Sequence, residues 1–388
     1  MKKVVILTRS LLDTHSKQIA VGGVQTYIHD LAQLCVKLHY TTVVYQLVGN
    51  DINHDEVKIH GFSVRFFPDT KKTEIACNQY AFDNIYNTEN CPECLFIIAT
   101  DWLGIKSKKD NVVHIQHGIA FDNSTYYENK EKNFISRCKY RFDRLNNCIK
   151  AVKRCQHIKN TVCVDYNFFN WYRTLGTIYP DNFIRVIPNY SGQFISPEAA
   201  QQKLKNRGSK KRIIFARRFF DYRGCLLFAA VAQRLLNEFN NIEIDFAGDG
   251  PLKDYLTQTF KGEERVKIFS YVATESVDVH TSYDIAVVPT IFSEGTSLAL
   301  CEAMAAACFP IATHVGGMTN IILDSYNGLL SYPDTESIYQ TCRKALLMTD
   351  EDFNNICHHA YYSALCSFSR QKWENSWQQY IENLFNKL

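Results

Sequence analysis

The sequence predicts an α/β protein with two doubly wound domains that face a central cleft. Short apolar runs rich in Val, Ile and Phe alternate from end to end with longer segments of helical periodicity. Near-continuous apolar strands joined by helical crossovers are typical of parallel sheets covered on both faces. A polar, basic stretch, residues 188–212, separates two series of such runs, and 388 residues suit two domains better than one.

Seven apolar runs predict strands in the first series and five in the second. They are residues 4–7, 42–48, 64–67, 95–99, 112–115, 161–164 and 185–187, followed by 213–216, 242–247, 266–269, 285–289 and 310–313. We place the domain boundary near residue 190, giving domains of residues 1–190 and 191–369, with residues 370–388 expected to complete the first. Ligands of such sheets bind at the carboxyl ends of the strands, so the loops there are the candidate sites.

Composition limits the function classes. Hydrophobic residues make up 46% of the chain and charged residues 21%, which is typical of a globular protein. The net charge of +3 is too small to indicate nucleic-acid binding. No apolar run is long enough to span a bilayer, and the apolar start at Val4 is too short for a secretion signal, so we expect a cytoplasmic protein.

The fourteen cysteines are scattered through the chain and are expected to be reduced, mostly buried thiols. Cys91 and Cys94 have CxxC spacing, which leaves a metal or redox role as an alternative. A zinc site would need two more ligands, and no second CxxC supplies them. A redox pair belongs at a helix start, whereas Cys94 leads directly into an apolar run. We therefore predict no metal site.

Residues 285–307 predict a strand, a loop and then a helix that begins near Thr296 or Ser297. The free N–H groups of such a helix start form an anion site that suits a diphosphate. Glu294 lies just before the helix and Glu302 about two turns inside it, where carboxylates suit sugar or ribose hydroxyls. The alternative is a capped helix with two solvated glutamates.

This segment resembles the signature of the GT4 family of retaining glycosyltransferases, which have the GT-B fold. Glu294 and Glu302 stand in the setting Glu-Gly-Thr-Ser-Leu-x3-Glu-Ala-Met-Ala, which is similar to the Glu-x7-Glu motif of that family. Upstream, residues 218–224 resemble the family's Arg-x4-Lys-Gly loop, with Arg223 where lysine is usual. Residues 248–251 resemble its Gly-x-Gly-Pro turn. The resemblance covers nearly the whole chain and is most specific in the second domain.

The resemblance implies a donor site in the second domain and an acceptor side in the first. Glu294 is expected beside the donor sugar, Glu302 on the ribose hydroxyls, and Arg218 and Arg223 on the diphosphate. The other donor-binding positions that it implies are Gly248, Gly250, Tyr271, Val272, Gly295, Thr296, Ser297 and Leu298. Tyr271 and Val272 are expected to contact the base through backbone atoms.

Two features of the first domain match the family less specifically. Gly22 and Gly23 open a helix after the first strand and resemble its N-terminal glycine loop, although a tight turn would also use them. His117 ends a strand, where the family often has a histidine beside the transferred sugar. The alternative for His117 is a purely structural histidine.

Residues 130–159 are strongly basic, with apolar residues interleaved at helical spacing. A basic amphipathic helix can lie on an anionic membrane surface, which would suit a lipid-linked acceptor. The alternative, which we favour here, is a helix packed on the first sheet with a solvated basic face.

The sequence thus predicts a retaining, metal-independent glycosyltransferase without a cofactor. The expected donor is a UDP-sugar or GDP-sugar, and the expected acceptor is a sugar, a glycan or a lipid-linked molecule in surface polysaccharide or glycolipid synthesis. Arginines and a helix start would stabilise the leaving diphosphate. The expected location is the cytoplasm, at the inner face of the membrane if residues 130–159 bind it. A nucleotide-sugar epimerase of the same fold and a non-catalytic sugar-binding protein are the alternatives.

Overall fold

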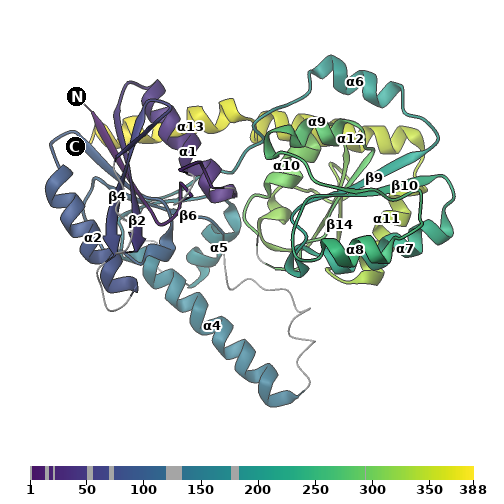
Figure 1. Ribbon diagram of the computed structural model, residues 1–388, viewed down its shortest axis with the longest axis horizontal. Helices are drawn as coiled ribbons and strands as arrows, with labels where there is room; N and C mark the ends of the chain where they lie inside the picture. Colours follow the sequence, from purple (N-terminus) through teal and green to yellow (C-terminus); the bar gives the residue numbers. More distant parts are fainter. Residues whose placement is uncertain are drawn as a thin grey trace. The chain divides into compact units, whose positions relative to one another are not determined.

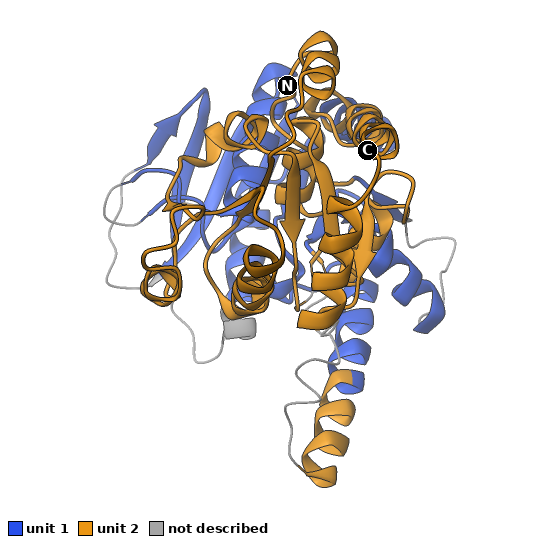
Figure 2. Cartoon of the chain, turned by 90° about the vertical axis from the view of Figure 1, so that its right-hand side faces the viewer, with its two compact units in different colours: residues 1–117, 145–187, 374–388 blue, residues 118–144, 188–373 orange. Residues whose placement is uncertain are grey.

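The computed structural model describes residues 2–13, 17–20, 22–49, 56–69, 74–118, 133–175, 183–292 and 294–388. The chain forms two compact units, shown in different colours in Figure 2. Unit 1 consists of residues 1–117, 145–187 and 374–388, and unit 2 of residues 118–144 and 188–373. Each unit holds one sheet.

The sheet of unit 1 has eight strands in the order β3-β4-β2-β1-β5-β6-β7-β8. All pairs are parallel except β3 with β4. The strands are β1 (Lys3–Thr8), β2 (Thr41–Gly49), β3 (Val57–Ile59), β4 (Phe62–Asp69), β5 (Cys94–Ile98), β6 (Val112–Gln116), β7 (Asn160–Cys163) and β8 (Phe183–Val186). β1, β5 and β6 are almost wholly buried, because helices cover the sheet.

The helices of unit 1 come from both ends of the chain. They are α1 (Gly23–Lys37), α2 (Glu74–Glu89), the 3₁₀ turn η1 (Asp101–Leu103), the second half of α4 (Phe134–Gln156), α5 (Tyr166–Leu175) and most of α13 (Arg370–Phe385). Figure 1 shows the C-terminal α13 beside the N-terminal α1. The buried Trp377 donates a hydrogen bond from Nε1 to the Tyr27 hydroxyl at 2.8 Å, which joins the two helices.

The sheet of unit 2 has six strands in the order β11-β10-β9-β12-β13-β14, all parallel. They are β9 (Lys211–Ala216), β10 (Ile242–Ala247), β11 (Ile268–Phe269), β12 (Ile285–Val288), β13 (Phe309–Thr313) and β14 (Leu329–Ser331). The helices are the first half of α4, then α6 (Pro197–Lys205), α7 (Cys225–Glu238), α8 (Lys253–Thr259), α9 (Ser276–Thr281), α10 (Leu298–Ala305), α11 (Thr335–Leu346) and α12 (Asp350–Ser367). The 3₁₀ turns are η2 (Asp221–Arg223), η3 (Ala273–Glu275) and η4 (Gly316–Asn320).

Alternate residues of the strands of unit 2 enter two separate cores. Ile213 and Phe215 of β9 pack with α7 and α11, whereas Ile214 and Ala216 pack with α9 and α10. In Figure 1, α7, α8 and α11 accordingly lie on one side of this sheet, and α9, α10 and α12 on the other. Burial of both faces explains why these strands appear in the sequence as continuous apolar runs.

The two sheets, flanked by helices, agree with the predicted α/β fold class, and each predicted strand overlaps an observed one. Two edge strands were missed. β3 and β14 have three residues each, too few for a recognisable period in the sequence. No helix in the described part of the chain is long and apolar enough to cross a bilayer.

Candidate functional site

The strand order of unit 2 places two loops together at a topological switch point. β9 and β12 are neighbours at the centre of the sheet. From β9 the chain continues to β10 and β11 on one side, and from β12 to β13 and β14 on the other. Open parallel sheets hold ligands at the carboxyl ends of such strands. The segment after β9 contains Arg217 and Arg218, and the segment after β12 contains Thr290 and Glu294.

Two arginines hold Glu294 from different loops. Arg217 Nη2 donates to both carboxylate oxygens of Glu294, at 2.8 and 2.7 Å. Arg223, at the end of η2, donates from Nη1 to Oε2 at 2.6 Å. The cluster therefore contains two cations and one anion, and the remaining positive charge suits an anionic ligand.

Thr290 completes the cluster. Its hydroxyl donates to Glu294 Oε2 at 3.0 Å and itself accepts a hydrogen bond from Arg217 Nη1. Burial opposes ionisation of Glu294, but Arg217 and Arg223 outweigh it and lower the pKa of this carboxyl to about 2. Burial also lowers the pKa of Arg217, yet a guanidinium titrates so high that it remains protonated. The ion pair is therefore fully charged at neutral pH.

Glu302 forms a second polar group on α10. The Ser276 hydroxyl, at the start of α9, donates to Glu302 Oε2 at 2.7 Å. Burial raises the pKa of Glu302, and the Ser276 hydrogen bond partly offsets the increase. Tyr271 is half-buried nearby, where burial and the charge of Glu302 raise the pKa of its hydroxyl. Ser276 thus fixes one carboxylate oxygen of Glu302.

Helix α10, which follows Glu294 and contains Glu302, begins at a serine whose side chain forms no capping hydrogen bond. Ser297 is the N-cap of α10, but its side chain makes no capping hydrogen bond, and its buried hydroxyl has no partner. Asn189 Nδ2 donates to the Thr296 carbonyl at 2.8 Å, which holds the preceding residue in place. The side chain of Ser297 therefore does not cap this helix, and a helix start suits an anionic ligand.

Glycines let the neighbouring loops approach these residues. A Cβ on Gly316, at φ +53°, would lie 2.1 Å from the carbonyl oxygen of Glu294, and the next residue, Gly317, donates its N–H to that oxygen at 2.7 Å. A Cβ on Gly248 would lie 2.0 Å from the Arg217 carbonyl oxygen. The glycine at position 248 is therefore required by the approach of the Arg217 backbone, whatever its contact with a ligand.

Other predicted donor-site residues lie nearby in the chain but outside this bonded cluster. Arg218 is exposed, and its guanidinium lies 5.6 Å from the centre of the Phe220 ring. Val272 has an exposed side chain before η3. Gly250 packs on the Phe219 backbone, where a Cβ would lie 2.7 Å from the carbonyl oxygen. The diphosphate role of Arg218 and the base role of Val272 stay predictions.

The predicted residues of unit 1 lie at the carboxyl edge of its sheet. Gly22 is the N-cap of α1 and Gly23 its first residue. His117 follows β6, and its Nε2 lies 2.8 Å from the Ala99 carbonyl oxygen. Because a carbonyl only accepts, Nε2 carries the proton and Nδ1 is left as an acceptor. Burial lowers the pKa of His117 to about 4, so the imidazole is neutral at neutral pH.

Three residues of the site in unit 2 were not predicted from the sequence: Arg217 and Thr290, which bind Glu294, and Ser276, which binds Glu302. Arg217 precedes the arginine of the recognised loop, and its burial was not visible in the sequence. Its position directly after an apolar strand, next to a second arginine, was the available signal. Thr290 and Ser276 have common residue types and gave none.

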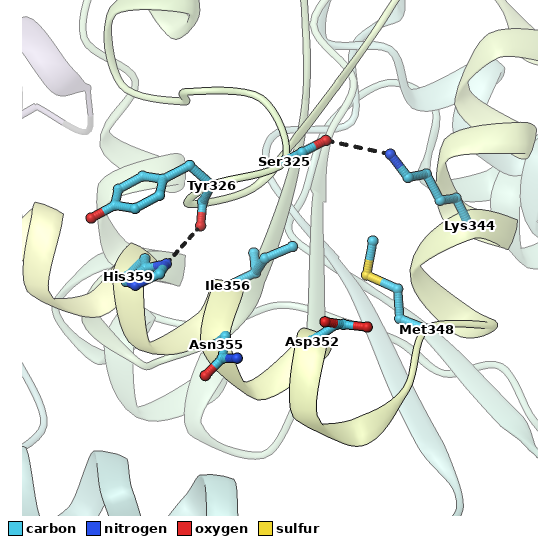
Figure 3. Close-up of a pocket in the computed structure, with 8 residues that line it drawn as sticks. All are labelled: Ser325, Tyr326, Lys344, Met348, Asp352, Asn355, Ile356 and His359. Atoms are coloured by element: carbon cyan, nitrogen blue, oxygen red, sulfur yellow. Dashed lines mark hydrogen bonds between the residues drawn. The ribbon is translucent and has the colours of Figure 1, made fainter.

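Two further features do not join this site. Cys94 is buried at the start of β5, and burial raises the pKa of its thiol to about 12, so it is not a thiolate at neutral pH. A pocket of about 330 Å³ lies between α11, α12 and the loop before β14 (Figure 3), and none of the predicted site residues lines it. In this pocket, His359 Nδ1 lies 3.1 Å from the Tyr326 carbonyl oxygen. In the described part of the chain, no three metal-ligating side chains gather.

Comparison with known proteins gives a family-model match and several curated relatives. Residues 210–347 match the family model of glycosyl transferases group 1. This chain is 26% identical over 187 residues to a lipopolysaccharide 1,2-N-acetylglucosaminetransferase of Salmonella typhimurium, covering 45% of this chain and 48% of that protein. It is 30% identical over 146 residues to an uncharacterized glycosyltransferase of Methanocaldococcus jannaschii, covering 34% and 41%. The chain thus matches about a third to a half of the length of its curated relatives.

Solved structures resemble the whole chain. Sucrose-phosphate synthase from Thermosynechococcus elongatus superposes with a TM-score of 0.72 at 14% identity, over 100% of both chains. Anabaena HepE, in complex with UDP-glucose, superposes with a TM-score of 0.67 at 15% identity, over 100% of both chains. The architecture is therefore the GT-B fold, a class with two Rossmann-like domains. The segment that matches the family model of glycosyl transferases group 1, residues 210–347, lies within unit 2.

Proposed function

We propose that this protein is a retaining glycosyltransferase that moves a sugar from a nucleoside-diphosphate sugar to an acceptor. The main support is the Glu294 carboxylate, which Arg217 and Arg223 bind at the topological switch point of the sheet. This position lies within the segment that matches the group 1 family model. The GT-B relatives include one in complex with UDP-glucose, which makes a UDP-sugar the first donor to test. The lipopolysaccharide transferase among the relatives supports a role in surface polysaccharide synthesis.

Leaving-group stabilisation is the chemical task, because negative charge develops on the departing diphosphate. Arg223 and the start of α10 are charged or dipolar groups suited to that charge. Glu294 is the group that orients the donor sugar and stabilises its developing positive charge, and Arg217 is its positioning residue. Glu302, with one oxygen fixed by Ser276, binds the ribose hydroxyls.

Metal independence follows from the same proposal. Arg223 and the start of α10 supply the positive charge that a divalent cation would otherwise provide at a diphosphate. Activity in excess chelator equal to that in added magnesium is expected. A requirement for magnesium would reject this part of the proposal and leave the transfer reaction standing.

Nucleotide release tests the function against its alternatives. Purified full-length protein is incubated with UDP-glucose, UDP-N-acetylglucosamine or GDP-mannose, with and without a glycan acceptor extract, and the freed nucleotide is measured. A transferase releases UDP or GDP faster with the acceptor. An epimerase converts the donor sugar without any acceptor, and a binding protein releases no nucleotide. Glu294→Gln should abolish release, and its full retention would reject the site.

The acceptor side includes a candidate membrane contact on α4. Residues up to 144 of α4 are assigned to unit 2 and those from 145 onwards to unit 1. Ile135, Phe142 and Ile149 recur every seven residues and are 79%, 68% and 42% exposed. Seven-residue spacing places them on one face of the helix. Lys130 and Lys132 of the predicted stretch lie outside the described residues.

The positive charge of α4 indicates what binds its exposed apolar face. Exposed cations of α4 are Arg137, Lys139, Arg141, Lys150 and Lys153, and the acidic residue of this helix is Asp143. A second copy of the same helix would bring like charges together, whereas an anionic bilayer would attract them. We therefore propose that α4 docks on an anionic membrane surface, which reverses the preference drawn from the sequence because the apolar face is exposed.

A further inference from the structure

Unit 1 has a topological switch point of its own, between β1 and β5. These strands are central neighbours, flanked by β2 and β6. In unit 2 the equivalent strand pair is β9 and β12, and the loop after β12 carries Glu294. In unit 1 the corresponding loop follows β5 and forms η1 (Asp101–Leu103). Ligands of open parallel sheets bind at this position.

Trp102 is the exposed residue of this loop. Its side chain is 60% exposed, whereas Asp101 and Leu103 on either side are buried at 6% and 1%. The loop is fixed by the Thr100 side chain, which accepts the N–H of Trp102 at 3.3 Å, and by Gly104 in the left-handed region at φ +65°. The ring thus projects from a rigid turn.

A cation supports the ring from α4. The Arg154 guanidinium lies 5.2 Å from the centre of the Trp102 ring, within the range of a cation–π contact. Arg154 Nε also lies 3.7 Å from Asp101 Oδ2, so the carboxylate beside Trp102 anchors the cation. A flat aromatic surface held in this way loses little conformational entropy when a ligand stacks on it.

We propose that a pyranose ring of the acceptor stacks on Trp102. The part of the acceptor that binds unit 1 is therefore a saccharide. One face of a pyranose presents C–H groups that pack on an aromatic ring, while its hydroxyls stay in water or bind polar groups. His117, bonded to Ala99 at the end of the same strand segment, offers Nδ1 as an acceptor for a hydroxyl. The assignment rests on the proposed transferase function.

The position of Arg154 separates this platform from the membrane-facing stripe of α4. Arg154 follows Ile149 by five residues, which is a rotation of about 140° around an α-helix. Trp102, which contacts Arg154, therefore lies away from the stripe of Ile135, Phe142 and Ile149. This favours a soluble saccharide over a bilayer as the ligand of Trp102.

Tryptophan fluorescence tests the platform. Of the four tryptophans, Trp373 and Trp377 are buried at 2% and 0%, and Trp171 is 37% exposed, so Trp102 dominates quenching by acrylamide. Maltose, chitobiose and lactose are the probes, at millimolar concentration with the full-length protein. At least one probe should protect Trp102 from acrylamide. Saccharide affinity, measured by calorimetry, should fall about tenfold in Trp102→Ala and less in Trp102→Phe.

The controls separate this inference from the proposed function. Trp171→Ala, the matched control, should keep saccharide affinity. Equal saccharide affinity in Trp102→Ala and wild type, no binding of any probe, or protection by anionic vesicles alone would each overturn the platform. Saccharide binding that depends on Trp102, without hydrolysis of any donor, would reject the transferase and leave the platform standing.

Discussion

Arg217, which follows β9, donates hydrogen bonds from Nη2 to both carboxylate oxygens of Glu294, which follows the neighbouring strand β12, at 2.8 and 2.7 Å. The two side chains are only 6% and 12% exposed, so each is a buried charge whose main compensation is the other. Removing one partner of such a pair leaves an uncompensated charge. The charge of Glu294 thus depends on Arg217, although Arg217 lies just before the loop of residues 218–224 that was identified in the sequence.

Arg217→Met should impair both stability and turnover. Loss of the partner is expected to lower the free energy of unfolding by about 3 kcal/mol, less if Arg223 takes over the carboxylate. Donor hydrolysis should fall at least about 100-fold, as when a preorganised electrostatic group is lost. Urea unfolding and UDP release measure the two effects. Arg218→Met, at the exposed neighbour, should leave stability within about 0.5 kcal/mol; equal loss of stability in both variants would contradict the assignment.

The pH dependence of stability should report the ionisation of Glu294. Its pKa is about 2 in the folded protein, against about 4.3 in an unfolded chain. The folded pKa is depressed, so its contribution, on the order of 3 kcal/mol, is complete above the unfolded pKa. It is lost as pH falls from about 4.3 towards 2. The free energy of unfolding of the wild type should therefore approach that of Glu294→Gln across this window. A difference between the two that stays constant down to pH 2 would contradict the prediction.

Gly316→Ala should displace the backbone of Glu294. The new methyl would lie 2.1 Å from the Glu294 carbonyl oxygen, at a φ of +53° that L-residues rarely adopt. We expect a loss of stability of about 1–3 kcal/mol and a larger relative loss of donor hydrolysis. Gly192→Ala is the matched control, because nothing lies within 4 Å of its Cβ position. Thermal unfolding of the two variants checks the difference.

Ser276→Ala should weaken nucleotide binding without changing the chemical step. The variant removes the 2.7 Å hydrogen bond that fixes Glu302, at a cost of about 1 kcal/mol. KM for the donor should rise about fivefold while kcat stays within about twofold. Steady-state UDP release measures both constants. A fall in kcat at unchanged KM would instead place Ser276 in the reaction itself.

Vesicle binding checks the exposed stripe of α4. Ile135→Ser with Phe142→Ser should reduce binding to vesicles containing phosphatidylglycerol by at least about tenfold, since two exposed apolar anchors are lost. High salt should weaken the wild-type binding as well. Leu347→Ser removes another apolar side chain that is 58% exposed, and should have no effect. Unchanged sedimentation of the α4 variant would exclude this surface.

The sequence by itself determined the class of fold and half of the site in unit 2. Continuous apolar runs predict buried parallel strands, because a strand covered on both faces has no polar side. The Glu294 and Glu302 motif was recognisable because its residues lie on one loop and one helix. Short edge strands escaped prediction, since three residues, as in β14, carry no period.

Only the tertiary structure decided which groups meet Glu294. Arg217 is 77 residues away in the chain, and it reaches the carboxylate because β9 and β12 are paired in the sheet. Trp102, in the loop after β5, and Arg154, in α4, likewise come together only in the folded chain. Such contacts depend on strand order and burial, which local patterns in a sequence do not contain.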